Sequence, residues 1–307
     1  MAGIYRADES FDLEFFKGSS CAFGVFDGVH IGHRFLIDEA RRTAREDGGA
    51  SIALTFDRDP DERFHPERLR KLMTNEERIA MLAETGVDAV VVLPFTVEFA
   101  ANLPNDFLSE TFQRSVPAHL HVGSDFHFGV RGSGTVEDLN LWSERLGTKI
   151  HAHRLVAEDG APVSATRIRL LLADGRIEDA NHLLGRNYFV SGTVEQGRGE
   201  GGDFGFKTAN FVVPEQMRAI GDGVYAAYAW VDGVRYKSAV NVGIPATFAD
   251  RSHAIFEAHL IDFDGDLYGK SLRVEFTNWL RPMRKFDSLE ELIATVNSNI
   301  AWARENL

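Results

Sequence analysis

From Ser20 to about Leu184, short apolar runs bounded by turn residues alternate with longer amphipathic segments. This alternation is typical of βαβ units, because consecutive parallel strands need a crossover connection that is usually a helix. We therefore expect an α/β domain with a doubly wound, Rossmann-like sheet. The predicted strands are Ala22–Phe26, Ser51–Phe56, Asp88–Leu93, Ala118–Val122 and Lys149–Leu155. The predicted helices are Phe35–Glu46, Thr74–Thr85, Pro104–Arg114 and Glu137–Leu146.

Around Gly185 the pattern changes, because glycine and aromatic residues become frequent and helical periodicity stops until Asp287. A chain of 307 residues is long enough for two domains, and we predict them at residues 1–185 and 186–307. The second should be a small β-barrel, closed or nearly closed, followed by an amphipathic helix that Ser288 and Glu291 cap. Its predicted strands are Tyr188–Glu195, Gly223–Val231, Val234–Val242, Ile255–Asp262 and Leu272–Trp279.

Charge and cysteine content restrict the expected partners and location. The formal net charge of −13 argues against nucleic acid or an anionic membrane as a partner. Cys21 is the single cysteine, so an intrachain disulfide is excluded, and together with an N-terminus unlike a secretion signal this favours the cytoplasm. No apolar run approaches the length of a membrane span. An oligomer is possible, but its state is not specified by the sequence.

The junction between the first predicted strand and helix runs from Ala22 to Arg34 and contains His30 and His33. A helix N-terminus presents unpaired N–H groups and a positive dipole end, and nearby glycines allow an anion to come close. Two histidines here are therefore candidate phosphate partners, although an isolated pair can equally be a cap or packing feature. His-x-Gly-His after an apolar strand and Phe-Asp-Gly resembles the signature of nucleotidyltransferases, which indicates a reaction class without a substrate.

Three further segments should meet this junction, since ligands bind at the carboxyl ends of the strands in doubly wound sheets. They are Leu54–Pro60, His121–Gly129 and Val163–Arg169. In the last segment Ser164, as a predicted N-cap, Thr166, Arg167 and Arg169 open a helix, and cations are unfavourable at that end unless an anion is bound there. Taken singly, Ser164 is a cap and Arg169 a solvated charge; together they predict a phosphate site.

Other histidines allow a metal-site alternative. They are His119, His121, His127, His151 and His153. Because they alternate along strands without an evident cysteine or carboxylate partner, we expect surface and edge residues rather than zinc ligands.

In the second domain, a glycine-rich segment runs from Gly197 to Asn210. It matches neither a dinucleotide-binding fingerprint, since no helix follows, nor a Walker loop, since no glycine directly precedes Lys207. It is either a long hairpin loop or a loop whose N–H groups wrap phosphates, with Thr208 and Asn210 as oxygen ligands suited to Mg²⁺. A calcium loop at Asp262–Asp266 is rejected because its twelfth position, Arg273, is not a glutamate.

Glu257 lies between apolar neighbours in a predicted strand, Phe256-Glu-Ala-His-Leu260. An inward-facing acid in such a place can act as a general base. Without context, the same residue is more often an exposed strand position.

Taken in order, these motifs resemble the prokaryotic bifunctional riboflavin kinase/FMN adenylyltransferase family, also called FAD synthetases. The resemblance covers nearly the whole chain. Its motifs are Phe-Asp-Gly-x-His-x-Gly-His, Thr-Phe-Asp, Val-Gly-x-Asp-Phe-x-Phe-Gly, Ser-x-Thr-Arg-Ile-Arg, Gly-Phe-x-Thr-Ala-Asn and Leu-Arg-Pro-x-x-Lys-Phe-Asp.

The resemblance implies a nucleotidyltransferase domain followed by a six-stranded riboflavin kinase barrel. It implies that ATP phosphorylates riboflavin to FMN and that a second ATP adenylylates FMN to FAD, releasing pyrophosphate. Glu257 would be the kinase base, with Thr208 and Asn210 as Mg²⁺ and ATP ligands. The ATP phosphates would meet the loop residues Gly197, Gly201, Gly205 and Lys207.

For the adenylyltransferase, the resemblance implies that His30 and His33 stabilise developing charge and that Ser164, Thr166 and Arg169 hold pyrophosphate. It implies further ATP contacts at Gly24, Phe26 and Asp27, and flavin contacts at Phe56, Asp125 and Phe128. Two alternatives stay open. The first is a monofunctional FMN adenylyltransferase with a flavin-binding barrel, because Ile244–Ala246 and Lys207 depart from the family pattern. The second is a non-catalytic flavin-sensing protein.

Overall fold

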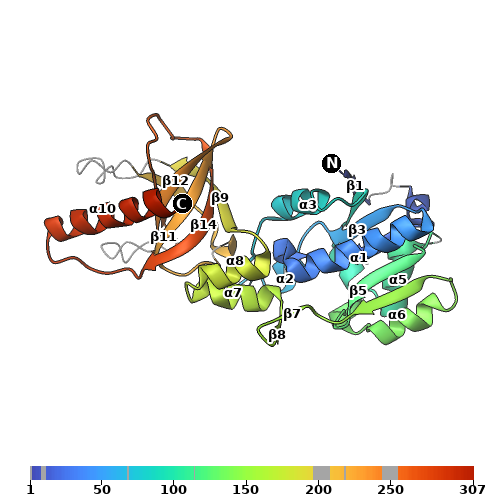
Figure 1. Cartoon of the computed structure of the whole chain (residues 1–307). Coiled ribbons are helices and arrows are strands. Elements are labelled where there is room, and N and C mark those ends of the chain that lie inside the picture. The colour runs from blue at the N-terminus through green and yellow to red at the C-terminus, as the bar shows by residue number, and fades with distance from the viewer. Residues whose placement is uncertain are drawn as a thin grey trace. The chain divides into compact units, whose positions relative to one another are not determined.

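The computed structural model describes residues 2–7, 12–67, 69–113, 115–195, 208–217, 219–243 and 255–307 (Figure 1). By internal packing the chain divides into two units, which are described separately below. One contains Met1–Leu69 and Thr74–Ser164, and the other contains Arg70–Met73 and Ala165–Leu307. This division falls before Ala165, whereas the sequence pattern changes at Gly185, so the boundary between the two activities stays a prediction.

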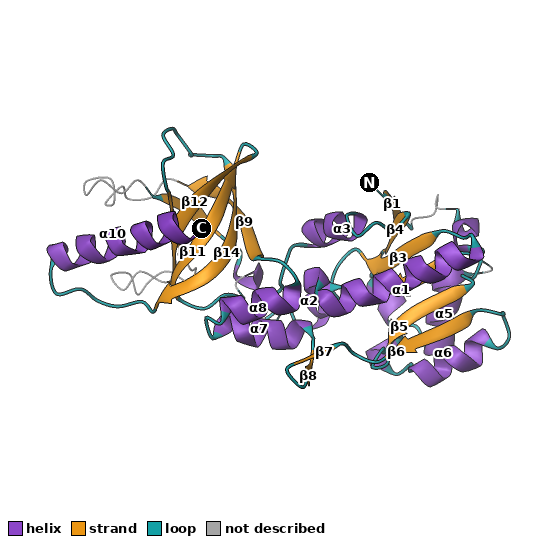
Figure 2. Ribbon diagram, viewed as in Figure 1, coloured by secondary structure: helices purple, strands orange, loops and turns teal. Residues whose placement is uncertain are grey.

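The first unit is built on a six-stranded parallel sheet in the order β1-β4-β3-β2-β5-β6 (Figure 2). This confirms the predicted doubly wound class. Its strands are β1 (Gly3–Arg6), β2 (Ser20–Phe23), β3 (Ser51–Phe56), β4 (Ala89–Leu93), β5 (His119–Gly123) and β6 (Lys149–His153). The sequence pattern missed β1, a mostly exposed edge strand of four residues without an apolar signature.

Helices cover both faces of this sheet. On one face lie α1 (Ile31–Asp47) and α3 (Asn75–Ala83), and Thr74 and Glu77 form a capping box at the start of α3. On the other face α5 (Pro104–Phe112) and α6 (Val136–Ser143) pack against an aromatic core. The remaining elements of this unit are η1 (Leu13–Phe16), η2 (Asp27–Val29), η3 (Val130–Gly132), α2 (Pro60–Phe64), α4 (Val97–Ala100), β7 (Ala157–Glu158) and β8 (Ala161–Pro162).

The strand order reverses at β2. The chain first builds β3 and β4 on one side of β2 and then crosses to build β5 and β6 on the other. In doubly wound sheets the carboxyl ends of the strands at such a switch point form the ligand crevice. The segment that follows β2 is therefore placed by topology where a ligand would bind.

The second unit contains two helices, α7 (Ala165–Ala173) and α8 (Ile177–Leu184), and a closed antiparallel barrel in the order β10-β13-β12-β11-β14-β9. The barrel confirms the predicted architecture. Its strands are β9 (Tyr188–Glu195), β10 (Ala209–Val212), β11 (Gly223–Val231), β12 (Val234–Gly243), β13 (Ile255–Leu260) and β14 (Ser271–Arg281). The sequence pattern missed β10, which has four residues and directly follows the glycine-rich segment. A short turn, η4 (Glu215–Met217), precedes β11.

The terminal helix α10 (Leu289–Asn306) covers part of the outer surface of the barrel. Ser288 caps it by accepting a hydrogen bond from the backbone N–H of Glu291, as the sequence predicts. Ile300 packs against Ala226 and Ile261, whereas Leu289 is exposed at the first turn.

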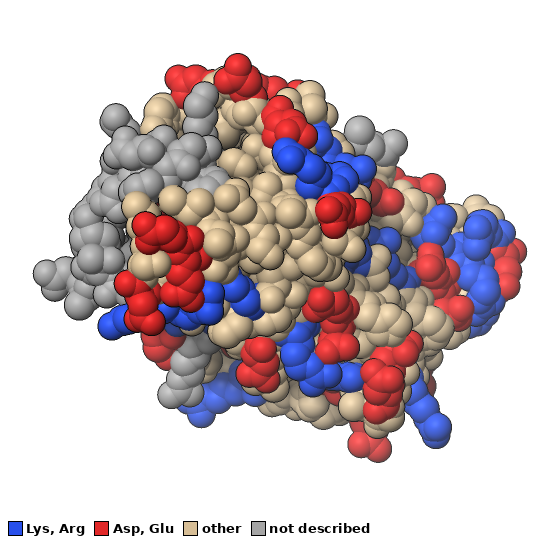
Figure 3. Space-filling view, turned by 60° about the vertical axis from the view of Figure 1, so that its left-hand side comes forward, with Lys and Arg blue, Asp and Glu red and all other residues tan. Residues whose placement is uncertain are grey.

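No helix in the described part of the chain combines the length and apolarity needed to cross a membrane. On the face drawn in Figure 3, acidic and basic side chains are interspersed.

Candidate active sites

The backbone between β2 and α1 takes an unusual path. Phe26 adopts a left-handed conformation, with φ 60° and ψ 30°, and Val29 has φ 39°. Left-handed conformations are disfavoured for side chains with a Cβ, and a β-branched residue there is an outlier. Such strain costs on the order of 1–3 kcal/mol per residue and concentrates at functional sites. The strained backbone of this turn is therefore consistent with a binding site.

His30 and His33 meet at the start of α1. His30 is the N-cap, and its Nδ1 accepts a hydrogen bond of 3.3 Å from the backbone N–H of His33. In its neutral form His30 must then carry its proton on Nε2, which makes that atom a donor. The two imidazole rings stack with centroids 3.5 Å apart, and Phe26 packs edge-on against His33 at 5.3 Å.

Two further properties distinguish His33. Its Nδ1 is buried without a hydrogen-bond partner among the described residues. Burial, followed by the nearby charges of His30 and Arg78, lowers the pKa of His33 well below its ordinary value. The imidazole is therefore neutral at physiological pH, and a buried unpaired nitrogen of this kind indicates a missing partner.

Arg78 of α3 fixes this turn from beneath and was missed by the sequence reasoning. Its side chain is 1% exposed, and it donates to the carbonyl oxygens of Val25 at 2.7 Å and Phe56 at 2.7 Å. It also donates to Thr55 Oγ1 at 2.5 Å. One buried guanidinium thus links the ends of β2 and β3. The charged run Asn75-Glu-Glu-Arg78 carries no local sign that Arg78 is buried.

Gly24 and Asp27 belong to the same turn. A Cβ atom at Gly24 would lie 3.2 Å from the ring of Phe26, so a side chain there would crowd the strained residue. Asp27 is 5% exposed and lies close enough to Arg78 for its charge to oppose the lowering of the Arg78 pKa by burial. The predicted ATP contacts at Gly24, Phe26 and Asp27 are therefore neighbours of the histidine pair.

The predicted flavin contacts have mixed surroundings. Phe56 and Phe128 are 5% and 4% exposed and belong to the aromatic core beneath α5. Asp125 is exposed in the loop after β5. The ring centroids of Phe56 and Phe128 lie 6.4 Å and 5.4 Å from that of Phe107, so both rings are part of the packed aromatic core.

The predicted pyrophosphate residues lie at the start of α7. Ser164 is half-buried and ends the first unit, whereas Thr166, exposed, and Arg169, half-buried, belong to the second. The Nε of Arg169 donates to the carbonyl oxygen of Arg70 at 2.5 Å, within the second unit. The helix start itself agrees with the sequence prediction, and the phosphate role of these residues stays a prediction.

In the barrel, three polar side chains from three strands form one row. Asn210 of β10 and Asn241 of β12 are the register partners of Glu257 on either side of β13. The Nδ2 of Asn241 donates to Glu257 Oε2 at 3.4 Å. The Oδ1 of Asn241 is buried without a hydrogen-bond partner in the described residues. Carboxylate and amide oxygens are the hard ligands that Mg²⁺ prefers, so this donor set fits that ion.

Glu257 does not face the barrel interior, so that expectation was wrong. Its neighbours Phe256 and Ala258 are fully buried in the barrel core. Since side chains alternate along a strand, Glu257 lies half-buried on the outer surface with Asn210 and Asn241. The apolar neighbours belong to the opposite face of the strand and do not surround the carboxylate.

The structure describes only some of the predicted kinase residues. Thr208 is exposed directly before β10, whereas Gly197, Gly201, Gly205, Lys207 and Ile244–Ala246 lie outside the described residues. Asn241, which the sequence reasoning missed, could have been found from the alternation in β12, because it lies on the polar face next to the glutamate strand.

The expectation of surface and edge histidines was also wrong for two of them. His119 and His121 are 6% and 0% exposed on β5, whereas His151 and His153 are half-buried on the edge strand β6 and His127 is exposed. Side chains of β5 are covered by α1, which the local strand pattern does not reveal.

Comparisons with known proteins agree with this two-part construction. A family model described as FAD synthetase matches residues 13–167, and one described as riboflavin kinase matches residues 184–307. Bifunctional riboflavin kinase/FMN adenylyltransferases are similar over most of their length. The protein from Pseudomonas fluorescens is 34% identical, covering 94% of this chain and 93% of the relative. The protein from Listeria monocytogenes is 32% identical, covering 91% and 89% respectively.

A solved structure also matches the whole chain. The crystal structure of a protein from Streptococcus pneumoniae, titled as a macrolide-efflux protein, has a TM-score of 0.84 and 28% identity, covering 94% of this chain and 95% of that one. With both family models and these relatives spanning both units, the chain belongs to the bifunctional riboflavin kinase/FMN adenylyltransferase family.

Proposed function

We propose that this chain makes FAD from riboflavin in two ATP-dependent steps, with Glu257 in the barrel serving the first and the His30–His33 pair serving the second. The observation that carries the assignment is the pairing of two separate constellations, one in each unit. The barrel offers a carboxylate between two asparagines, and the sheet offers two imidazoles at a helix N-terminus.

In the kinase step, Glu257 takes the proton from the terminal ribityl hydroxyl of riboflavin as that oxygen attacks the γ-phosphorus of ATP. The bond from the γ-phosphorus to the bridging oxygen breaks, and ADP leaves with that oxygen. Asn241 supports this role because its amide donates to Glu257 Oε2 and so orients the carboxylate. Phosphoryl transfer depends mainly on positioning and on neutralising charge, and a row of fixed side chains supplies positioning.

We propose Mg²⁺ as the ion of this step. Asn210, Asn241 and Thr208 would offer amide and hydroxyl oxygens to it, and the unpaired, buried Oδ1 of Asn241 supports that assignment. When bound, Mg²⁺ would neutralise phosphate charge. The protein residues themselves hold the hydroxyl and accept its proton.

In the adenylyl step, a phosphate oxygen of FMN attacks the α-phosphorus of a second ATP, and the bond to the β-phosphate oxygen breaks to release pyrophosphate. The charge that develops on the phosphate oxygens needs donors already in place. His30, with its proton on Nε2, and the first N–H groups of α1 are such donors. His33 is held neutral by burial, so it contributes through hydrogen bonding rather than as a cation.

We further propose that the partners of this enzyme are small molecules and that it acts in the cytoplasm. Cys21 supports the second point. It is free and buried, and burial raises the pKa of its thiol to about 12. Such a thiol is unreactive, and unpaired cysteine usage is typical of reducing compartments.

The test is a product assay with riboflavin, ATP and Mg²⁺, in which chromatography should show FMN and then FAD. The His33→Ala variant should accumulate FMN, because loss of one preorganised contact costs about 3–4 kcal/mol in the transition state. Replacing Mg²⁺ with a chelator should stop the first step. Adenylylation of added FMN without riboflavin phosphorylation would instead select the monofunctional alternative, and binding of flavin without turnover would select the sensing protein.

A further inference from the structure

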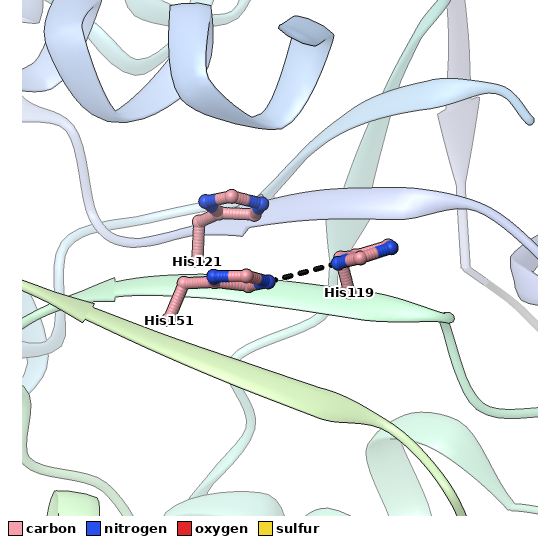
Figure 4. Close-up of side chains that lie close together, drawn as sticks. All are labelled: His119, His121 and His151. Atoms are coloured by element: carbon pink, nitrogen blue, oxygen red, sulfur yellow. Dashed lines mark hydrogen bonds between the residues drawn. The ribbon is translucent and has the colours of Figure 1, made fainter. Parts of the chain in front are cut away.

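Four histidines gather on one face of the sheet, away from the turn that carries His30 and His33. They project from neighbouring strands, His119 and His121 from β5 and His151 and His153 from β6. His121 and His151 are register partners, and their rings stack with centroids 4.3 Å apart (Figure 4). The α1 helix covers this face, because Thr43 Oγ1 of α1 lies 2.9 Å from His121 Nε2.

The histidines are joined in pairs through their ring nitrogens. His119 Nδ1 lies 2.8 Å from His151 Nε2, as the dashed line in Figure 4 marks. His121 Nδ1 lies 2.9 Å from His153 Nε2. Each contact joins two nitrogens, so it can hold one proton between two lone pairs.

A carboxylate orients the first pair. His119 Nε2 lies 2.7 Å from Asp47 Oδ2, at the last residue of α1. In this contact the Asp47 carboxylate accepts a hydrogen bond from the His119 Nε2–H. His119 Nδ1 is then left as a lone pair facing His151. Metal-binding histidines commonly donate their second N–H to a carboxylate in this way.

The imidazoles of this cluster are packed closely together, since the ring of His121 stacks on His151 at 4.3 Å and on His153 at 5.2 Å. Imidazole nitrogens are ligands for metal ions. Neither of the two proposed reactions uses these rings.

We propose that His119, His121 and His151 form a site for a borderline divalent cation of the Zn²⁺ type. One nitrogen from each residue lies within 4.8 Å of the others. Three imidazoles suit Zn²⁺, Co²⁺, Ni²⁺ or Cu²⁺, whereas Mg²⁺ prefers oxygen ligands. The site is therefore different in ligand chemistry from the Mg²⁺ site proposed in the barrel.

Binding of Zn²⁺ requires small rearrangements of the three histidine side chains. At Zn–N distances of about 2.0–2.1 Å, tetrahedral ligand nitrogens lie about 3.3 Å apart. The His119–His151 contact of 2.8 Å must therefore widen slightly, and the ring of His151 must rotate out of its stack with His121. His121 must also give up one of its two contacts, the one to His153 or the one to Thr43. His151 is half-buried on the edge strand, where the broad terminal torsion of histidine allows this turn. The ring proton of His151 moves from Nε2 to Nδ1 by exchange with solvent, so that the Nε2 lone pair binds the cation and the imidazole stays neutral.

The experiment uses the full chain, freed of metal by dialysis against a chelator. Co²⁺ is added as a spectroscopic probe, and Zn²⁺ is then titrated to displace it. We expect one tight site per chain, with the visible absorption of tetrahedral Co²⁺ and a higher thermal unfolding temperature of the first unit when Zn²⁺ is bound. Excess Mg²⁺ should not displace the Co²⁺.

Two variants locate the site. His151→Gln removes a ligand at a half-buried edge position and should abolish the tetrahedral Co²⁺ spectrum. Asp47→Asn leaves every ligand in place but removes the carboxylate behind His119, and should weaken Zn²⁺ binding about 10- to 100-fold. The matched controls are His65→Gln, at an exposed histidine, and Asp38→Asn, at an exposed aspartate of α1.

Both controls should bind as the unchanged protein does, and circular dichroism of each metal-free variant should show an intact fold. Absence of a tight site in the unchanged protein would overturn the proposal. Equal binding by the folded His151→Gln variant would also overturn it, because the metal would then be bound elsewhere, for example at His30 and His33.

Discussion

The two proposed active sites are built in opposite ways. In the first unit, the backbone itself forms the site, through the strained turn at Phe26 and the first turn of α1, and Arg78 fixes that turn from inside the core. In the second unit, the backbone is regular, and the site is a row of side chains on the outer surface of a barrel. The proposed adenylyl-transfer site is therefore local in sequence, whereas the proposed kinase row exists only after three strands have paired.

Their electrostatics differ as well. His33 is kept neutral by burial, so its protonation and the packing of the first unit are linked. Glu257 is half-buried and bonded to one asparagine, so replacing it should change chemistry more than folding. Substitutions can therefore separate the two sites.

The largest expected effect is on the barrel site. Glu257→Gln keeps the shape of the side chain but cannot accept the proton, so riboflavin phosphorylation should fall about 10²- to 10⁴-fold. Adenylylation of added FMN should be unchanged, which a coupled pyrophosphate assay measures. Glu275→Gln, a half-buried glutamate on β14 paired with Arg273, is the control. Normal phosphorylation by the Glu257 variant would show that another group is the base.

An intermediate effect is expected at Arg78. Arg78→Met removes the donor to the buried carbonyls of Val25 and Phe56 and should destabilise the first unit by about 3 kcal/mol. Adenylylation should fall with it, while riboflavin phosphorylation remains. Hydrogen exchange of the α1 amides gives the local stability, and Arg145→Met, at an exposed position, should leave it unchanged. Equal loss of both activities would contradict the separation of the two sites.

The smallest effect concerns acid stability. Since the pKa of His33 is lowered in the folded state, the unfolded chain binds more protons below the ordinary histidine pKa of about 6.5. The free energy of unfolding of the first unit should therefore fall as the pH drops from about 7 to about 5, by up to about 1.4 kcal/mol per pH unit from this group. His33→Asn should have a shallower slope in hydrogen exchange. Parallel slopes would mean that His33 does not carry this linkage.

The sequence predicted most of the sheet because each unit of strand and helix has a local signature. The cap at Ser288 was predicted correctly for the same reason, since a helix cap depends on residues within one turn. The His30–His33 junction is also local, so it could be proposed as a phosphate site before the fold was known. The short strands β1 and β10 carry too few residues for a period to be detected.

The sequence by itself therefore determined the order of most elements and the two architectures, and it supplied the candidate residues of both proposed reactions except Asn241. Only the tertiary structure decided which side chains are neighbours. It placed Asn241 beside Glu257, turned Glu257 to the outer surface, buried Arg78 under the turn and gave His119 a carboxylate partner in Asp47. The physical reason is that strand pairing and helix packing join residues far apart in the chain, and burial and hydrogen-bonding partners are properties of those contacts.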